Sequence, residues 1–105
     1  MTKPTIGQET LKLDVRGAYL RRTDLSHASL REANLSKADF SNAILRGADF
    51  KDAILDGTIL KGADLTGAKN LTRAQLSKAI LDSTTKLPDE FLISEFLSDS
   101  AGVSG

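Results

Sequence analysis

The chain has 105 residues, enough for one domain, and its 14 basic and 14 acidic side chains give a formal net charge of zero. A balanced charge creates no long-range field that attracts a nucleic acid or an anionic membrane, so neither is expected as a partner. Cysteine is absent, which excludes disulfides and thiolate chemistry. No apolar run is long enough to span a bilayer, and residues 1–8 lack the apolar core of a secretory signal; the cytoplasm is therefore the expected location.

Residues 1–12 come before any repeated pattern. Pro4 and Gly7 predict an irregular start to this segment. The pattern that follows predicts a stacked coil, and the terminal layers of such a coil expose apolar interior unless something covers them. We therefore interpret residues 1–12 as an N-terminal cap segment.

Residues 13–67 repeat one five-residue phrase. The phrase places Ala first, a polar residue second and Leu or Phe third, followed by two variable residues. The third, central position is occupied by Val15, Leu20, Leu25, Leu30, Leu35, Phe40, Leu45, Phe50, Leu55, Leu60 and Leu65. The first position is occupied by Leu13, Ala18, Thr23, Ala28, Ala33, Ala38, Ala43, Ala48, Ala53, Thr58 and Ala63. A repeat of this regularity indicates a solenoid or another repeat architecture.

Within each phrase the apolar residues alternate with polar ones, as side chains do along a β-strand. The first and third residues are therefore predicted to point inward and the second and fourth outward. The fifth residue turns a corner, and Gly17, Gly47, Gly57, Gly62 and Gly67 occur there. So short a strand cannot bury a face by itself. Stacked coils can, which predicts an all-β solenoid with Ala and Leu inside.

The runs Ala33-Asn34-Leu35-Ser36-Lys37-Ala38-Asp39-Phe40-Ser41-Asn42 and Gly62-Ala63-Asp64-Leu65-Thr66-Gly67 resemble the pentapeptide-repeat proteins. The resemblance covers about half of the chain in unbroken register. It implies a right-handed quadrilateral β-helix with four phrases in each coil. The segment from Gly67 to Thr72, with Thr85-Lys86-Leu87-Pro88 later, is similar to the C-terminal ending of cyanobacterial members especially.

The outward positions carry mixed charge, with Asp or Asn before the central residue and Arg or Lys after it. Exposed ion pairs of this kind contribute little stability each, so we interpret them as ordinary surface. Three outward positions are apolar instead: Ile44, Ile54 and Ile59. With four phrases per coil they fall on three faces, although Ile54 and Ile59 would lie close to one corner. These two are candidates for a small protein contact.

The phrase ends after Gly67, and residues 68–105 are expected to form a helical C-terminal cap and tail. Thr72 and Gln75 have the spacing of a capping box, and Leu76, Ala79 and Ile80 then form one apolar stripe. We therefore expect a helix from 72 to about 82, lying over the end of the coil.

A second helix is predicted after Pro88, which suits a first helical turn. Its apolar residues are Phe91, Leu92, Ile93, Phe96 and Leu97. Two interpretations remain open: a second capping helix, or a stripe that contacts a partner protein or a second copy of the chain. Residues 98–105 are small and polar and are expected to be a disordered tail.

Catalytic, metal and cofactor sites are not indicated. His27 is the only histidine and occupies an outward corner position, where no oriented partner or pocket is expected. No glycine-rich phosphate loop precedes a helix, and the carboxylates do not cluster at metal-ligand spacing. We predict that the chain is not an enzyme and requires no cofactor.

The function predicted from the sequence is a non-catalytic protein-binding or scaffold module. It would act through the solenoid surface and the C-terminal apolar helix, with a protein partner of unknown identity. The alternative implied by the resemblance is interaction with a topoisomerase such as gyrase by DNA mimicry. That mechanism requires a longer and more acidic rod than these neutral repeats provide.

Overall fold

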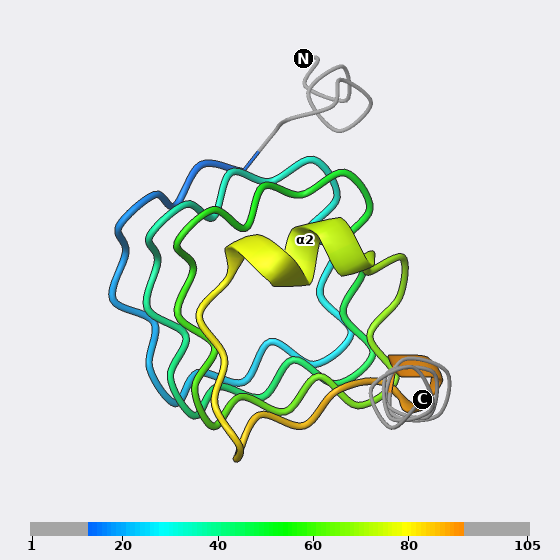
Figure 1. Ribbon diagram of the computed structural model, residues 1–105. Helices are drawn as coiled ribbons and strands as arrows, with labels where there is room; N and C mark the ends of the chain where they lie inside the picture. The colour runs from blue at the N-terminus through cyan, green and yellow to red at the C-terminus, as the bar shows by residue number, and fades with distance from the viewer. Residues whose placement is uncertain (1–12, 92–105) are drawn as a thin grey trace.

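The computed structural model describes residues 13–91, and in them the chain winds into a four-sided coil (Figure 1). Parallel β-bridges join residues that are 20 positions apart: Asp14 pairs with Asn34, and Asn34 with Ile54. One turn of the coil therefore contains four five-residue phrases. The predicted period, the inward and outward directions and the quadrilateral shape are all present.

Each side of the coil is a stack of bridged outward residues, and we number the sides in chain order. The first face contains Asp14, Asn34 and Ile54; the second Tyr19, Asp39, Ile59 and Ile80; the third Asp24, Ile44, Asp64 and Lys86; the fourth Ser29, Asp49 and Lys69. Because a corner follows every side within a few residues, the pairing consists of isolated bridges and no extended strand forms in residues 13–91.

Backbone hydrogen bonds hold neighbouring coils together on every face. Leu35 N–H donates to the Ile54 carbonyl at 2.9 Å, and Asn34 N–H donates to the Leu13 carbonyl at 2.8 Å. Each outward residue thus bonds the coil before it, while the next residue along bonds the coil after it. This ladder of hydrogen bonds holds each coil in register with the next.

The interior of the coil is closely filled. Leu35, Leu45, Leu55, Leu60, Leu65, Phe40 and Phe50 are at most 1% exposed. Ala38 and Ala48, at the other inward position, are completely buried, since only a small side chain fits between the large ones. Thr58 occupies an alanine position, and its buried hydroxyl donates to the Leu35 carbonyl at 2.7 Å.

The corners are β-turns whose third residue has left-handed backbone angles. The turn after Leu35 is closed by a 3.0 Å bond from Ala38 N–H to the Leu35 carbonyl, and Lys37 has φ 61°. Glycine takes this position at five corners, whereas Arg22, His27, Glu32, Lys37, Asn42 and Asp52 take it at the others. The non-glycine residues accept a backbone conformation that is costly for L-amino acids because hydrogen bonds to the neighbouring coil hold it in place.

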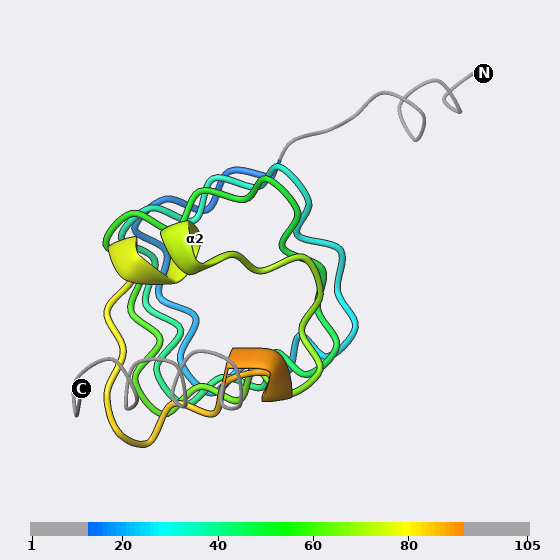
Figure 2. The ribbon, with the colours of Figure 1, turned by 45° about the vertical axis from the view of Figure 1, so that its right-hand side comes forward.

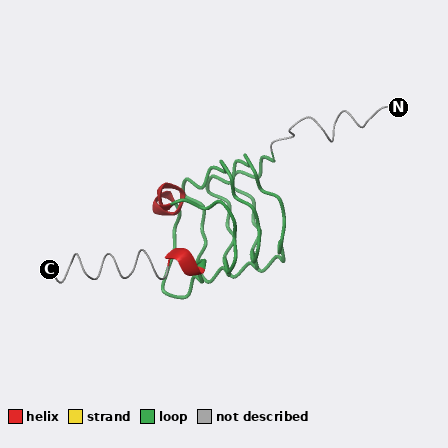
Figure 3. Ribbon diagram, turned by 90° about the vertical axis from the view of Figure 1, so that its right-hand side faces the viewer, coloured by secondary structure: helices red, strands yellow, loops and turns green. Residues whose placement is uncertain are grey.

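Helix α2 (Arg73–Lys78) begins as predicted and lies across the end of the coil (Figures 1 and 3). The Thr72 hydroxyl accepts from Gln75 N–H while the Gln75 side chain accepts from Thr72 N–H, which is the expected capping box. Leu76 is 7% exposed and joins the core. The helix is nevertheless shorter than the predicted 72–82, because it ends at Lys78.

The coil does not end at residue 67 as the sequence suggested. Lys69 still pairs with Asp49, and after α2 the chain returns to the ladder, with Ile80 on Ile59 and Lys86 on Asp64. The offsets are now 21 and 22 residues, so a helix replaces one side of the last coil and slightly longer corners restore the pairing. Ile80 is therefore a ladder residue and not part of a helical stripe.

The last described residues form a second helical turn over 89–91, at a different side of the coil's end from α2 (Figure 2). Pro88 is fully buried and Phe91 is 8% exposed and packs with the core. The predicted N-terminal cap segment, residues 1–12, and the rest of the predicted second helix lie outside the described residues.

Candidate interaction surfaces

Outward Asp and Asn side chains fasten the corners of the coil. Each accepts a hydrogen bond from the backbone N–H two residues further on, as in an Asx-turn. The residues that do so are Asp14, Asp24, Asn34, Asp39, Asp49, Asp64 and Asp82. Where Ser or Thr follows, as in Asp39 and Ser41, the hydroxyl donates to the same oxygen. The polar position of the phrase is therefore structural.

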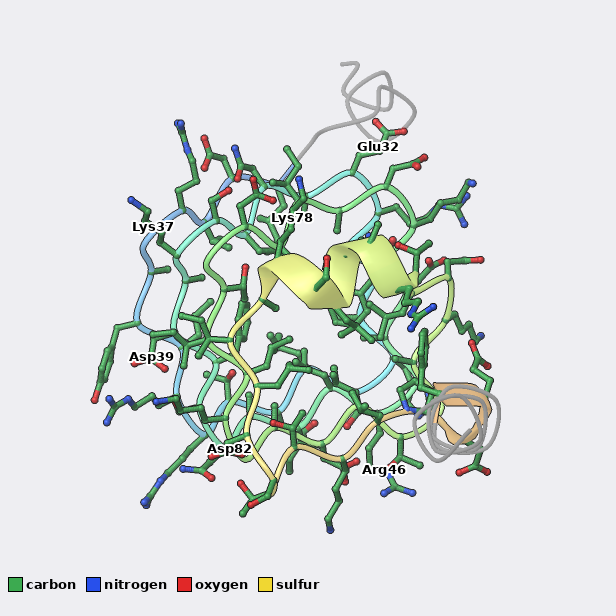
Figure 4. All side chains as sticks on the ribbon, in the orientation of Figure 1. Glu32, Lys37, Asp39, Arg46, Lys78 and Asp82 are labelled. Carbon is green, nitrogen blue, oxygen red and sulfur yellow. The ribbon has the colours of Figure 1, made fainter. Side chains whose placement is uncertain are left out.

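Three of these aspartates also form ion pairs between neighbouring coils. Arg21 contacts Asp39 at 2.8 Å, Arg31 contacts Asp49 at 3.0 Å, and Arg46 contacts Asp64 at 3.1 Å. In each pair the arginine is 18 residues before the aspartate, so the bond runs diagonally from one coil to the next. Asp39 and Arg46 lie at different sides of the coil (Figure 4). The pairs neutralise carboxylates on three of the four faces.

These contacts keep the carboxylates ionised. Hydrogen bonds from Ser41 and from the Arg21 guanidinium lower the pKa of Asp39 to about 2. Burial by itself raises the pKa of Asp64, but the hydrogen bonds from Thr66 and Arg46 outweigh it, so the pKa of Asp64 is lowered. A catalytic acid requires a carboxyl that holds a proton near neutral pH. The pKa values of Asp39 and Asp64 are lowered instead, so both carboxylates act as ionised hydrogen-bond acceptors within the fold.

His27 lies where the sequence placed it, at an exposed corner with φ 63°. Its side chain makes no hydrogen bond to any residue from 13 to 91, and the neighbouring corner in the next coil is Gly47. Across the same residues, no three His, Cys, Asp or Glu side chains are grouped so that they could hold a metal ion. No helix among them is long and apolar enough to cross a membrane.

Two open hollows lie on the surface of the described part of the coil. One hollow lies beside the start of α2, between Lys51, Asn70 and Thr72. The other lies on the first face, where Leu13 and Ile54 are bordered by Asp14 and Asp52. Both open to solvent, so neither would shield a reaction from water.

The predicted contact residues Ile54 and Ile59 lie on different faces of the coil. Ile54 is 43% exposed on the first face, whereas Ile59 is half-buried on the second face. Phe91 packs with the core, which favours the capping interpretation for that residue. The remaining predicted contacts, Leu92, Ile93, Phe96 and Leu97, lie outside the described residues.

Sequence reasoning missed Ile80 as an apolar neighbour of Ile59. Ile80, which is 42% exposed, is bridged to Ile59 on the second face, and the strongly exposed Tyr19 belongs to the same column. A signal was present: Ala79-Ile80-Leu81 and Thr85-Lys86-Leu87 each repeat the inward-outward-inward phrase after the helix. The interruption of the five-residue repeat at Asn70 concealed this later pattern.

The stacked, bridged four-sided coil places the protein in the class of β-solenoids. The model of the family described as pentapeptide repeats matches residues 14–47 and 43–82, with eight copies of the repeat. The chain therefore belongs to the pentapeptide-repeat family. The expected right-handed quadrilateral β-helix is the fold of this family.

Similar solved structures are also pentapeptide repeat proteins. Rfr23 from the cyanobacterium Cyanothece 51142 is 28% identical over 73% of this chain, with a TM-score of 0.64. The matched part is 52% of Rfr23, so this chain spans about half of that protein. The Nostoc Pcc 7120 protein alr5209 is 31% identical, with 80% of this chain and 78% of that chain covered and a TM-score of 0.30. A search of curated proteins finds no match.

Proposed function

We propose that the chain is a non-catalytic protein-binding module that acts through the outer surface of its coil. The observation that carries this proposal is the division between interior and surface. The interior is filled by buried Ala, Leu and Phe side chains, and outward aspartates such as Asp39 are occupied in corner turns and diagonal ion pairs. The large apolar side chains that stay exposed include Tyr19, Ile44, Ile54 and Ile80, which are suited to contact.

A rigid coil of this kind presents its exposed side chains at fixed spacing, which reduces the entropy lost on binding. Contact through Leu92, Ile93, Phe96 and Leu97, with a partner or a second copy of the chain, stays part of the proposal, as does a cytoplasmic location. The Phe91 side chain is not part of that surface, because it is buried.

The proposal is tested by crosslinking full-length variants in cells of the source organism. A photo-reactive amino acid is placed at one exposed position per variant: Tyr19, Ile44, Ile54 or Phe96. Crosslinks to one defined protein from one or two of these positions are expected. Equal, low-level crosslinks from all four positions to many abundant proteins would contradict a specific binding surface.

Binding to gyrase by DNA mimicry receives no support. A DNA mimic needs rows of uncompensated carboxylates, whereas Asp39, Asp49 and Asp64 are each paired with an arginine of the neighbouring coil. The formal net charge of the chain is zero. Binding to purified gyrase that depended on Asp39 and Asp64 would reverse this conclusion.

A further inference from the structure

The second face combines exposed apolar side chains that come from separate coils. Tyr19 is 73% exposed, and Ile80 is 42% exposed and bridged to Ile59. The Arg21 guanidinium lies 5.0 Å from the centre of the Tyr19 ring and also contacts Asp39. Four bridged residues span about 14 Å at one strand spacing per step. Tyrosine, arginine and large aliphatic side chains together are typical of the energetic centre of protein interfaces.

The charge around this column is positive. Lys37 and Lys78 lie at the corner before the face, and Arg22 and Lys61 at the corner after it. None of these four side chains forms an ion pair with a residue in the described range. Of the nearby carboxylates, Asp39 is neutralised by Arg21, and Asp82 accepts bonds from Gly62 N–H and Thr84. The donors to Asp82 are neutral, so Asp82 keeps its negative charge, as does Asp56 at the first corner; four unpaired cations therefore surround the column together with two such carboxylates.

The other exposed isoleucines have different surroundings. On the third face, Ile44 lies between Asp24 and Asp64 in its column. On the first face, Ile54 shares its hollow with Asp14, Glu32 and Asp52. Of the four faces within residues 13–91, the second alone combines two adjoining isoleucines with an excess of cations.

We propose that the second face docks an acidic protein segment, a proposal that rests on the protein-binding function above. An apolar side chain of the segment packs on Ile59 and Ile80, and its carboxylates approach Lys61 and Lys78. A protein segment fits this face better than a nucleic acid does, because Tyr19 is the only aromatic side chain that the described residues place on it, and aliphatic side chains offer no stacking platform for bases.

The test selects peptides from a displayed library of random 12-residue sequences, with the full-length chain as bait. Selected peptides are synthesised, and their affinities are measured by fluorescence anisotropy at low and at physiological salt. We expect them to contain more Asp and Glu than the unselected library, together with an apolar residue. Their binding should weaken as salt rises, because exposed charges are screened.

Matched variants locate the contact. The Tyr19→Ser and Ile80→Ser changes together should weaken binding at least tenfold, and Lys61→Glu several-fold. Ile44→Ser on the third face and Lys69→Glu on the fourth should change it less than twofold. All these side chains point outward, and thermal melting of each variant checks that the coil is intact.

Every other outcome overturns the inference. Peptides without an acidic excess, or no selected peptide at all, would exclude an acidic segment as the occupant. Peptides whose binding depends on Ile44 or Ile54 instead would leave the surface-binding function standing and move the contact to another face. A single-stranded 20-nucleotide DNA or RNA that binds the chain, but not the Tyr19→Ser variant, would assign the face to nucleic acid.

Discussion

The side-chain amide of Gln75 donates a hydrogen bond of 2.9 Å to the backbone carbonyl of Ala53, 22 residues earlier. In the preceding coils the corresponding carbonyl receives a backbone N–H: Leu13 from Asn34, and Ala33 from Ile54. Helix α2 removes the next backbone donor in that series, and the glutamine side chain takes its place. Gln75 also donates to the Phe50 carbonyl at 2.8 Å and accepts from Thr72 N–H at 2.8 Å. One side chain thus ends the ladder on the first face and starts the helix.

We therefore expect Gln75→Ala to lower the free energy of unfolding by about 2 kcal/mol, because two part-buried carbonyls lose a donor and the capping box is broken. The measurement is the shift in urea-unfolding free energy. Gln75→Glu retains the acceptor for Thr72 N–H but turns a carboxylate toward two carbonyl oxygens, so it should also destabilise. Ser77→Ala, on the exposed side of the same helix, is the control. A neutral Gln75→Glu would show that only the capping box matters.

The register predicts opposite results for adjacent residues. Leu45 is fully buried and Ile44 is 38% exposed. Leu45→Asp places an uncompensated charge in the core and should abolish the folded state, whereas Ile44→Asp should leave melting within a few degrees of the parent. Circular dichroism melting measures both. Ala48→Arg should unfold the coil like Leu45→Asp, since the Ala48 site is completely buried. A folded Leu45→Asp variant would contradict the assigned interior.

The low pKa of Asp39 predicts that the free energy of unfolding decreases at acidic pH. Because Ser41 and Arg21 hold the folded-state pKa at about 2, below the ordinary value of 3.8, the ionised form stabilises the fold. This contribution is complete above about pH 4 and is lost as the pH falls from about 4 to 2. The urea midpoint of the parent should fall over that range, and that of Asp39→Asn should fall less steeply.

The control for this experiment is Asp56→Asn. The Asp56 carboxylate forms no hydrogen bond or ion pair with the described residues, so this change removes a carboxylate without removing a contact of the fold. Identical acid profiles for the parent and Asp39→Asn would exclude the Arg21–Asp39–Ser41 contacts as a source of stability.

The corner glycines differ in how much space a side chain would have at each position. Gly17 and Gly47 both have left-handed backbone angles, but a Cβ at Gly17 meets no atom of residues 13–91 within 4 Å, whereas one at Gly47 lies 2.5 Å from Nδ1 of His27. Gly17→Ala should cost about 1 kcal/mol from backbone strain alone. Gly47→Ala should cost more, since the imidazole must move.

The added cost at Gly47 is attributable to one side chain, and a double-mutant cycle measures it. In a His27→Ala background, Gly47→Ala should cost about as much as Gly17→Ala, or about 1 kcal/mol. The readout is the free energy of urea unfolding of the four proteins in the cycle. An undiminished cost in the His27→Ala background would mean that the corner itself, and not the imidazole, excludes a side chain.

The sequence by itself determined the coil, its interior and its corners. A five-residue repeat encodes the direction of every side chain locally, so the buried state of Leu35 and Ala38 and the corner position of Gly47 follow from their place in the phrase. The start of α2 was equally local, because Thr72 and Gln75 satisfy each other within one helical turn.

Only the tertiary structure decided what depends on the neighbouring coil. The ion pair between Arg21 and Asp39 is diagonal because the aspartate approaches from the next layer, and no spacing within one phrase specifies that choice. For the same reason, the sequence did not indicate that α2 ends at Lys78. Leu76, Ala79 and Ile80 fit a helical stripe, but pairing with Ile59 draws Ile80 into the ladder. Long-range backbone hydrogen bonds overrode the local pattern there, and they built the second face, on which Ile59 and Ile80 meet.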